Sequence, residues 1–205
     1  MHGLRLMVAA SLAVSSAPAL AQAWIDYRSS VDDFRIHTPG EFEIEEITYP
    51  SEYGVTLPAR VYSYADGDNR YSVTVVDYTH SERLHTERER NEAEYLIYWE
   101  IDIRASIAYA AWNLRQRGGE VTYDAYHYID RVEGHQLQIT NEDESRTYAA
   151  IYLHDSRLYI VEATVPPRSI PPAFFQQSLQ FLDESGERIR YERFADVVKV
   201  RNPAR

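Results

Sequence analysis

Four strand-like runs follow one another in the second half of the chain, and only short polar links separate them. The runs cover residues 121–129, 135–140, 147–154 and 158–165. Links of this length join neighbouring strands as hairpins, so the runs should pair antiparallel in chain order, as a meander. The last run, in RLYIVEATVPP, places Tyr159 on one face and Leu158 and Ile160 on the other. We therefore expect an inner strand that is covered on both sides.

The first half of the chain predicts three more strands. A short strand at 34–37 stops at the turn signal Pro39-Gly40. Two runs with alternating apolar residues then flank the sequence DGDN at 66–69, which predicts a hairpin with an Asp-Gly turn. The DGDN sequence lacks the further ligands of a calcium loop, so the turn is the simpler interpretation.

Two stretches have helical spacing. The first predicts a helix over 87–117 that ends at Gly118-Gly119. Its apolar stripe consists of Ala93, Leu96, Ile103, Ile107, Ala110, Ala111 and Leu114. The second helix is predicted in AFFQQSLQFLD, residues 173–183, directly after Pro172. Its narrow apolar stripe consists of Phe174, Phe175, Ser178, Leu179 and Leu182.

The N-terminus has the pattern of a secretory signal peptide. Arg5 precedes an apolar run at 6–14, and Ala19 and Ala21 have the spacing of a cleavage site. The run is too short for a transmembrane span, so we expect cleavage after Ala21, or at the next candidate, Ala23. The predicted organisation is a signal peptide at 1–21, one α+β domain at 22–186, and a tail at 187–205 with at most one extra strand at 196–201. The protein should then be periplasmic or secreted.

Composition excludes several classes of site and partner. The chain has no cysteine, which rules out disulfides, a thiolate nucleophile and a Cys-ligated metal. Its formal net charge of -11 should repel a phosphate backbone, so we expect no nucleic-acid partner.

Two blocks of the sequence resemble the PsbP-like or Mog-type superfamily. FRIHTPGEF is similar to the strand and turn with which that family opens, and EGHQLQITNEDESRTYAAIYLHDSRLYIVEATVPP is similar to its later strands. The resemblance implies an α+β fold with a central antiparallel β-sheet and flanking helices, a PsbP-like α/β/α sandwich. It also implies a role in binding or stabilising another protein. No functional residue of the family matches this chain position by position, so none is transferred.

The sequence lacks the usual signatures of an enzyme. We find no G-x-S-x-G elbow, no glycine pattern that cradles phosphate and no paired metal-ligand spacing. We therefore predict an exported, non-enzymatic binding or accessory protein of the cell envelope with no cofactor and no metal. Its partner would be another envelope protein or a small ligand. The alternative is an envelope hydrolase or metal-dependent enzyme that uses sheet histidines, namely His127, His135 or His154 with Asp124 or Glu133.

Aromatic residues supply the candidate binding surface. Tyr95, Tyr98 and Trp99 begin the long predicted helix and cannot all face a sheet, because a helix buries one side. We predict that these three residues bind the partner, unless the N-terminal strand or the tail after Glu187 covers them. Pairs of tyrosines also share strand faces, and such faces fit either a partner surface or the underside of a helix. The pairs are Tyr62 with Tyr64, Tyr126 with Tyr128, and Tyr148 with Tyr152.

Overall fold

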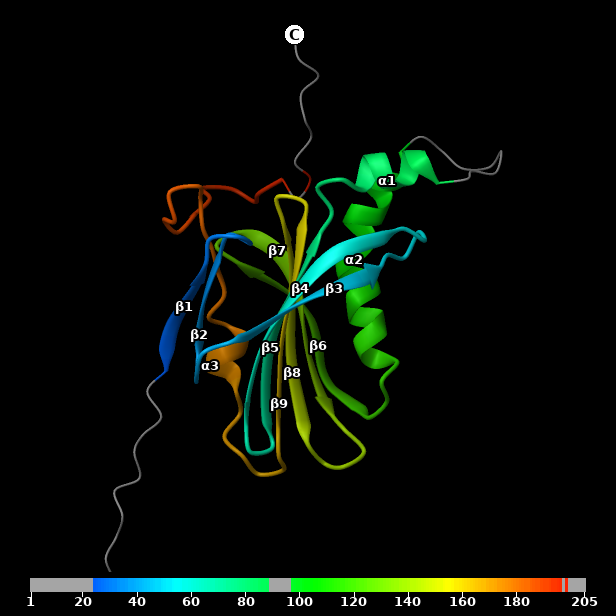
Figure 1. Cartoon of the computed structure of the whole chain (residues 1–205). Coiled ribbons are helices and arrows are strands. Elements are labelled where there is room, and N and C mark those ends of the chain that lie inside the picture. Colours follow the sequence, from blue (N-terminus) through cyan, green and yellow to red (C-terminus); the bar gives the residue numbers. More distant parts are fainter. Residues whose placement is uncertain (1–23, 89–96, 197, 199–205) are drawn as a thin grey trace, which may run out of the picture.

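A computed structural model describes residues 24–88, 97–196 and 198 of the chain. Two antiparallel sheets make up most of the regular secondary structure, as Figure 1 shows. The larger sheet has the order β3-β4-β5-β9-β8-β7-β6, and the smaller one β1-β2-β10. The strands are β1 (Ile25–Ser29), β2 (Phe34–Thr38), β3 (Glu43–Pro50), β4 (Thr56–Asp66), β5 (Asn69–Asp77), β6 (Glu120–Ile129), β7 (Val132–Thr140), β8 (Arg146–His154), β9 (Arg157–Val165) and β10 (Gln180–Phe181). The helices are α1 (Ser81–Glu87), α2 (Tyr98–Arg115) and α3 (Ala173–Gln176).

The two faces of the large sheet are covered by different elements (Figure 1). Helix α2 packs on one face, chiefly against β7 and β8, and the core there is mostly aliphatic. The small sheet and α3 pack on the other face, where the core is rich in aromatic residues and is here called the aromatic core. The aromatic members of that core are Phe34, Tyr62, Tyr152, Tyr159, Phe175 and Phe181.

The predicted meander is confirmed. Strands β6, β7, β8 and β9 pair antiparallel in chain order, and β9 lies between β8 and β5. Residues from both faces of β9 are buried, so it is an inner strand as its sequence predicts. The hairpin of β4 and β5 turns at Gly67, which has a left-handed φ of 56°. At Gly118 and Gly119 the backbone is also left-handed, and α2 ends before them as predicted.

The prediction of one helix over 87–117 is wrong. Helix α1 ends at Glu87 because Arg88 is extended, with φ -73° and ψ 146°, and an extended residue breaks the helical hydrogen bonding. The Arg88 side chain donates instead to the carbonyl of Tyr53. The second helix of this region, α2, starts at Tyr98. Two residues of the predicted stripe, Ala93 and Leu96, lie outside the described residues.

The prediction of a helix over 173–183 is also wrong. Helix α3 is a single turn, and Gln180 and Phe181 then pair with β2 as the third strand of the small sheet. This pairing satisfies the free edge of β2 and buries Phe181 completely, a residue that the predicted stripe left out. Phe174, which the stripe included, is 56% exposed.

The predicted fold class is therefore right at its coarser level. The central sheet is antiparallel with helices against it, but the fold is mostly β, and the second flanking layer is largely a small sheet.

Packing continues past residue 186, since Ile189, Tyr191 and Ala195 lie against the aromatic core. Of the extra strand predicted at 196–201, only Asp196 and Val198 are described, and neither is in a strand. Residues 197 and 199–201 lie outside the described residues. Among the described residues, no helix is long and apolar enough to cross a membrane.

Candidate ligand-binding pocket

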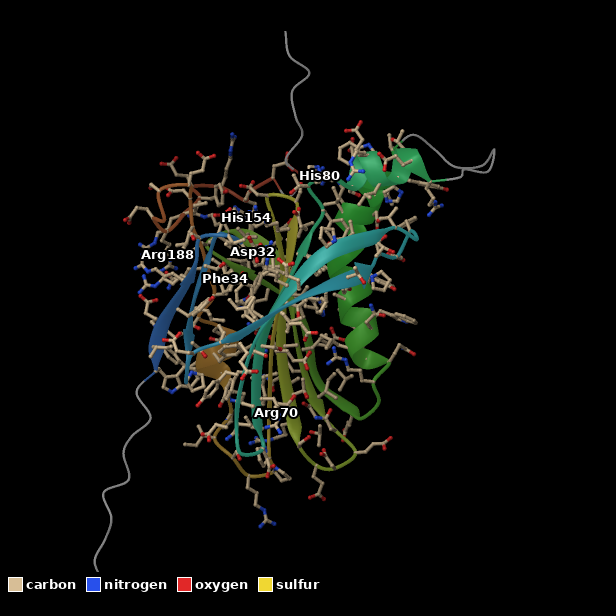
Figure 2. The ribbon with its side chains drawn as sticks, viewed as in Figure 1. Asp32, Phe34, Arg70, His80, His154 and Arg188 are labelled. Carbon is tan, nitrogen blue, oxygen red and sulfur yellow. The ribbon has the colours of Figure 1, made fainter. Side chains whose placement is uncertain are left out.

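The turn between β1 and β2 carries two adjacent carboxylates, and its position is fixed from several sides. Asp32 is 3% exposed, and its carboxylate accepts hydrogen bonds from the Tyr62 hydroxyl at 2.6 Å and from Arg60 at 2.8 Å. The Tyr159 hydroxyl donates to the Asp32 carbonyl at 2.9 Å. Figure 2 shows Asp32 and Phe34 between the small sheet and the large one. The turn is thus a rigid part of the aromatic layer.

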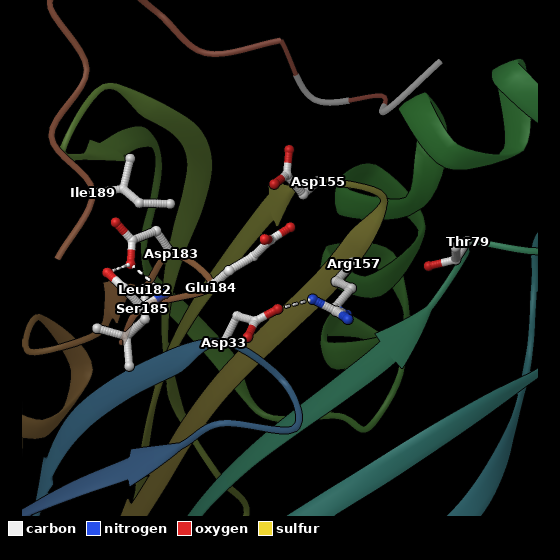
Figure 3. Close-up of a pocket in the computed structure, with 9 residues that line it drawn as sticks. All are labelled: Asp33, Thr79, Asp155, Arg157, Leu182, Asp183, Glu184, Ser185 and Ile189. Carbon is white, nitrogen blue, oxygen red and sulfur yellow. Dashed lines mark hydrogen bonds and ion pairs between the residues drawn. The ribbon is translucent and has the colours of Figure 1, made fainter. Parts of the chain in front are cut away.

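A cavity of about 640 Å³ opens beside this turn (Figure 3). Its size lies within the usual range for small-molecule sites. It is formed by the β1–β2 turn, the link after β5, the β8–β9 turn and the segment that follows β10. The lining residues are Asp33, Thr79, Asp155, Arg157, Leu182, Asp183, Glu184, Ser185 and Ile189.

The pocket is acidic. Its carboxylates are Asp33, Asp155, Asp183 and Glu184, and four negative charges against the single positive charge of Arg157 leave a formal charge of -3. Arg157 donates to Asp33 at 2.5 Å. Burial opposes the charge of Arg157, but the neighbouring Tyr159 and Asp33 outweigh that effect and raise the pKa of its guanidinium. Arg157 therefore stays protonated and holds Asp33 in place.

Asp183 is kept ionised by its own turn. Its Oδ1 accepts hydrogen bonds from the Ser185 hydroxyl at 2.6 Å, the Ser185 amide at 2.9 Å and the Glu187 amide at 3.0 Å. The bond from the Ser185 hydroxyl, followed by the amide bonds, lowers the pKa of Asp183. The Asp183 side chain thus presents a fixed negative charge at the pocket wall.

A second cavity, of about 300 Å³, is lined by Asp32 of the β1–β2 turn and by residues of β3, β4 and β5. It contains three carboxylates, Asp32, Glu46 and Asp77, and the guanidinium of Arg60. Some residues that line the two cavities are neighbours: Asp32 and Asp33 are adjacent in the β1–β2 turn, and Asp77 is the cross-strand partner of Arg157. Both cavities are therefore lined by carboxylates near this turn.

The histidines of the alternative enzyme are not brought together. His135 bonds to Asp124 at 2.5 Å on the face covered by α2. His127 bonds to the Tyr152 hydroxyl at 3.0 Å on the opposite face, and His154 bonds to the Tyr191 hydroxyl at 2.7 Å on that same face. Across the described ranges, no group of three or more His, Cys, Asp or Glu side chains could hold a metal ion.

Two of the three predicted binding aromatics, Tyr98 and Trp99, lie at the start of α2, and neither lines the pocket. Tyr95 lies outside the described residues. Tyr98 is partly exposed and its ring lies 5.7 Å from that of Tyr53. Trp99 is partly buried and packs against the aliphatic core. Of the predicted tyrosine pairs, Tyr126 and Tyr128 are exposed, whereas Tyr62, Tyr148 and Tyr152 are buried.

Comparison with known families and with curated proteins found no match to this chain. The pocket itself was not predicted from the sequence, because carboxylates are so frequent that no pair stands out. A signal was present, since Asp33, Asp155 and Asp183 each lie in a short turn at the end of a strand. Turn carboxylates at one end of an antiparallel sheet are candidates for a shared site.

Proposed function

We propose that this chain is an exported, non-enzymatic binding or accessory protein of the cell envelope, with PsbP-like architecture, that binds a cationic group in the pocket beside Asp33. The observation that carries the proposal is the formal charge of -3 in a preformed cavity of about 640 Å³. The chemistry expected of the ligand is an ammonium or guanidinium group, which would pair with the carboxylates there. Such a group can belong to a free amine or to a Lys or Arg side chain of an envelope protein.

The PsbP-like assignment is supported by the antiparallel sheet, the inner strand β9 and the early turn at Pro39-Gly40, which all follow the order of the resemblance. Export is supported by the signal pattern at 1–21. Export has a direct test, which is the N-terminal mass of the protein recovered from the envelope fraction. A chain that begins at Gln22 or Trp24 supports export. An intact Met1 in the cytosolic fraction contradicts it.

The binding test is a calorimetric titration of the mature chain with two probes. Putrescine represents a free amine, and N-acetylarginine amide represents a protein side chain. Asp183→Asn should weaken binding by no more than about fivefold, because Asp183 is exposed and exposed ion pairs contribute little. Asp143→Asn is a matched control, since Asp143 also accepts from a serine amide and hydroxyl two residues on, but outside the pocket.

The affinity should also fall as salt rises, because screening weakens the attraction. Preference for putrescine would assign the site to a small ligand, and preference for the arginine amide would assign it to a protein partner. No binding of either probe at millimolar concentration, or an equal effect of Asp143→Asn and Asp183→Asn, would refute the cationic site.

A further inference from the structure

The two edges of the large sheet, β3 and β6, differ in chemistry. On one edge, β3 carries Glu43, Glu45 and Glu46, and it ends at Pro50, which has no amide hydrogen to donate. Charges and prolines are the devices with which natural sheets prevent edge-to-edge pairing. The β3 edge is therefore protected against another strand.

The β6 edge lacks this protection. Within its regular part the only carboxylate is Asp124, and that charge is already paired with Arg115 at 2.7 Å and with His135. Aromatic side chains dominate instead: Tyr123, Tyr126 and Tyr128 are all exposed, and the exposed Phe194 ring lies 5.6 Å from that of Tyr128. In the described part of the chain, no strand pairs with the outer side of β6. Exposed tyrosines beside an unpaired strand are typical of a protein interface.

We propose that β6 pairs antiparallel with β6 of a second copy of this chain, so that the two large sheets form one continuous sheet across a two-fold axis. We infer the partner strand from the contrast between the two edges of the sheet. Pairing of β6 with β3 would add copies head to tail without limit, and the glutamates of β3 oppose it. Pairing of β6 with β6 uses the same edge on both copies and stops at two.

Charge also selects the register. In an antiparallel pair, directly opposed residues have their side chains on the same face of the sheet. The two-fold axis must therefore lie where one residue is opposite its own copy, and not where it is opposite the copy of its neighbour in the chain. An axis at Asp124 would place two carboxylates opposite each other, which is unfavourable. The strand is regular from Tyr123 to Ile129, after an irregularity at Val121/Tyr123, and Tyr126 is the midpoint of that stretch. An axis at Tyr126 places Asp124 opposite Tyr128 and opposes no like charges.

Single cysteines test this register directly, because the chain contains none of its own. Tyr126→Cys lies on the axis, where opposed Cα atoms are about 4.5–5.5 Å apart, a separation that a disulfide spans. Mild oxidation should convert most of Tyr126→Cys to a covalent dimer. Ile44→Cys, at an equally exposed site on the β3 edge, should stay largely monomeric and serves as the matched control. Equal cross-linking of the two variants would overturn the proposal.

The oligomeric state of the chain without cysteines gives an independent test. Light scattering after size exclusion should show twice the mass of the monomer at high protein concentration. Tyr126→Lys should weaken the dimer at least tenfold, because two ammonium groups would face each other, whereas Ile44→Lys should have no effect. Circular dichroism would check that both variants fold. A monomer at every concentration, or a dimer that tolerates Tyr126→Lys, would contradict self-pairing.

The dependence on salt concentration distinguishes the proposed dimer from the proposed cation binding in the pocket. Each copy carries a formal charge of -11, so screening should strengthen the dimer while it weakens cation binding. Either proposal can therefore fail without the other. A monomer whose β6 amides become protected from hydrogen exchange only in envelope extract would assign the edge to a different protein and refute the second copy as its occupant.

Discussion

The two faces of the large sheet are covered in different ways, and only one of them leads to a pocket. Under α2 the buried side chains are mainly Leu, Ile, Val and Ala, which need shape and volume but no hydrogen-bond partners. Under the small sheet many of the buried side chains are aromatic, and the tyrosine hydroxyls among them require partners. The Asp32 carboxylate and carbonyl supply partners to Tyr62 and Tyr159. The packing of the aromatic face therefore fixes the turn that forms the pocket wall.

Among the described residues two carboxylates are buried, Asp32 and Asp102, and their oxygens are satisfied to different degrees. Both oxygens of Asp32 accept hydrogen bonds. Asp102, in α2, is completely buried and bonds to His85 of α1 through Oδ2 at 2.8 Å, while its Oδ1 has no hydrogen-bond partner among the described residues. Burial of a polar atom without a partner costs free energy. Asp32 should therefore contribute more to stability than Asp102.

The largest expected effect comes from the aromatic core. Phe34→Ala should lower the free energy of unfolding by about 3–5 kcal/mol, since Phe34 is fully buried and its ring lies 4.9 Å from that of Tyr62. Leu114→Ala, on the aliphatic face, should cost about 2–5 kcal/mol. Denaturant unfolding measures both. Of the two variants, only Phe34→Ala should also weaken cation binding, because Phe34 directly follows Asp33. An equal loss of binding in Leu114→Ala would contradict the inference that only the aromatic face positions the pocket.

A smaller effect should distinguish the two buried carboxylates. Asp32→Asn should cost about 2–3 kcal/mol, because it removes the charge that faces the partly exposed Arg60. Asp102→Asn should cost about 1 kcal/mol or less, because the amide oxygen can still accept a bond from His85. The difference in unfolding free energy between the two variants is the measurement. The comparison is wrong if Asp102→Asn costs as much as Asp32→Asn.

The aromatic residues at the start of α2 allow a further comparison. Trp99→Ala should cost about 2 kcal/mol, since the ring packs against the aliphatic core. Tyr98→Ala should change stability by no more than about 0.5–1 kcal/mol, so it is the better test of the predicted partner surface. If Tyr98 binds a partner, Tyr98→Ala should keep the thermal midpoint but lose whatever the wild type recovers from the envelope. Unchanged recovery would remove Tyr98 from the binding surface.

Local patterns predicted the meander and the end of α2, because alternation and glycine act over a few residues. They missed β10, since Gln180 and Phe181 lie in a segment of helical spacing and become a strand only where β2 offers a free edge. They also missed the pocket, because Asp33 and Arg157 meet across 124 positions of sequence. Contacts of that separation depend on sheet order, which periodicity does not determine.

The smallest predicted effect is a pH dependence confined to the aromatic face. Burial lowers the pKa of His127, whose Nδ1 shares a hydrogen bond with Tyr152. The unfolded chain, with a histidine pKa of about 6.5, then binds more protons than the folded chain in the interval below that value. The contribution of His127 is thus fully present above pH 6.5 and is lost as the pH falls through that interval. Because the ring is partly solvated, the loss should be well under 1 kcal/mol.

Unfolding curves recorded between pH 7.5 and 5 measure this loss. His127→Asn should flatten the slope of unfolding free energy against pH, and the exposed control His80→Asn should not. A slope that His127→Asn leaves unchanged would mean that the aromatic face accepts a charged imidazole as readily as water does.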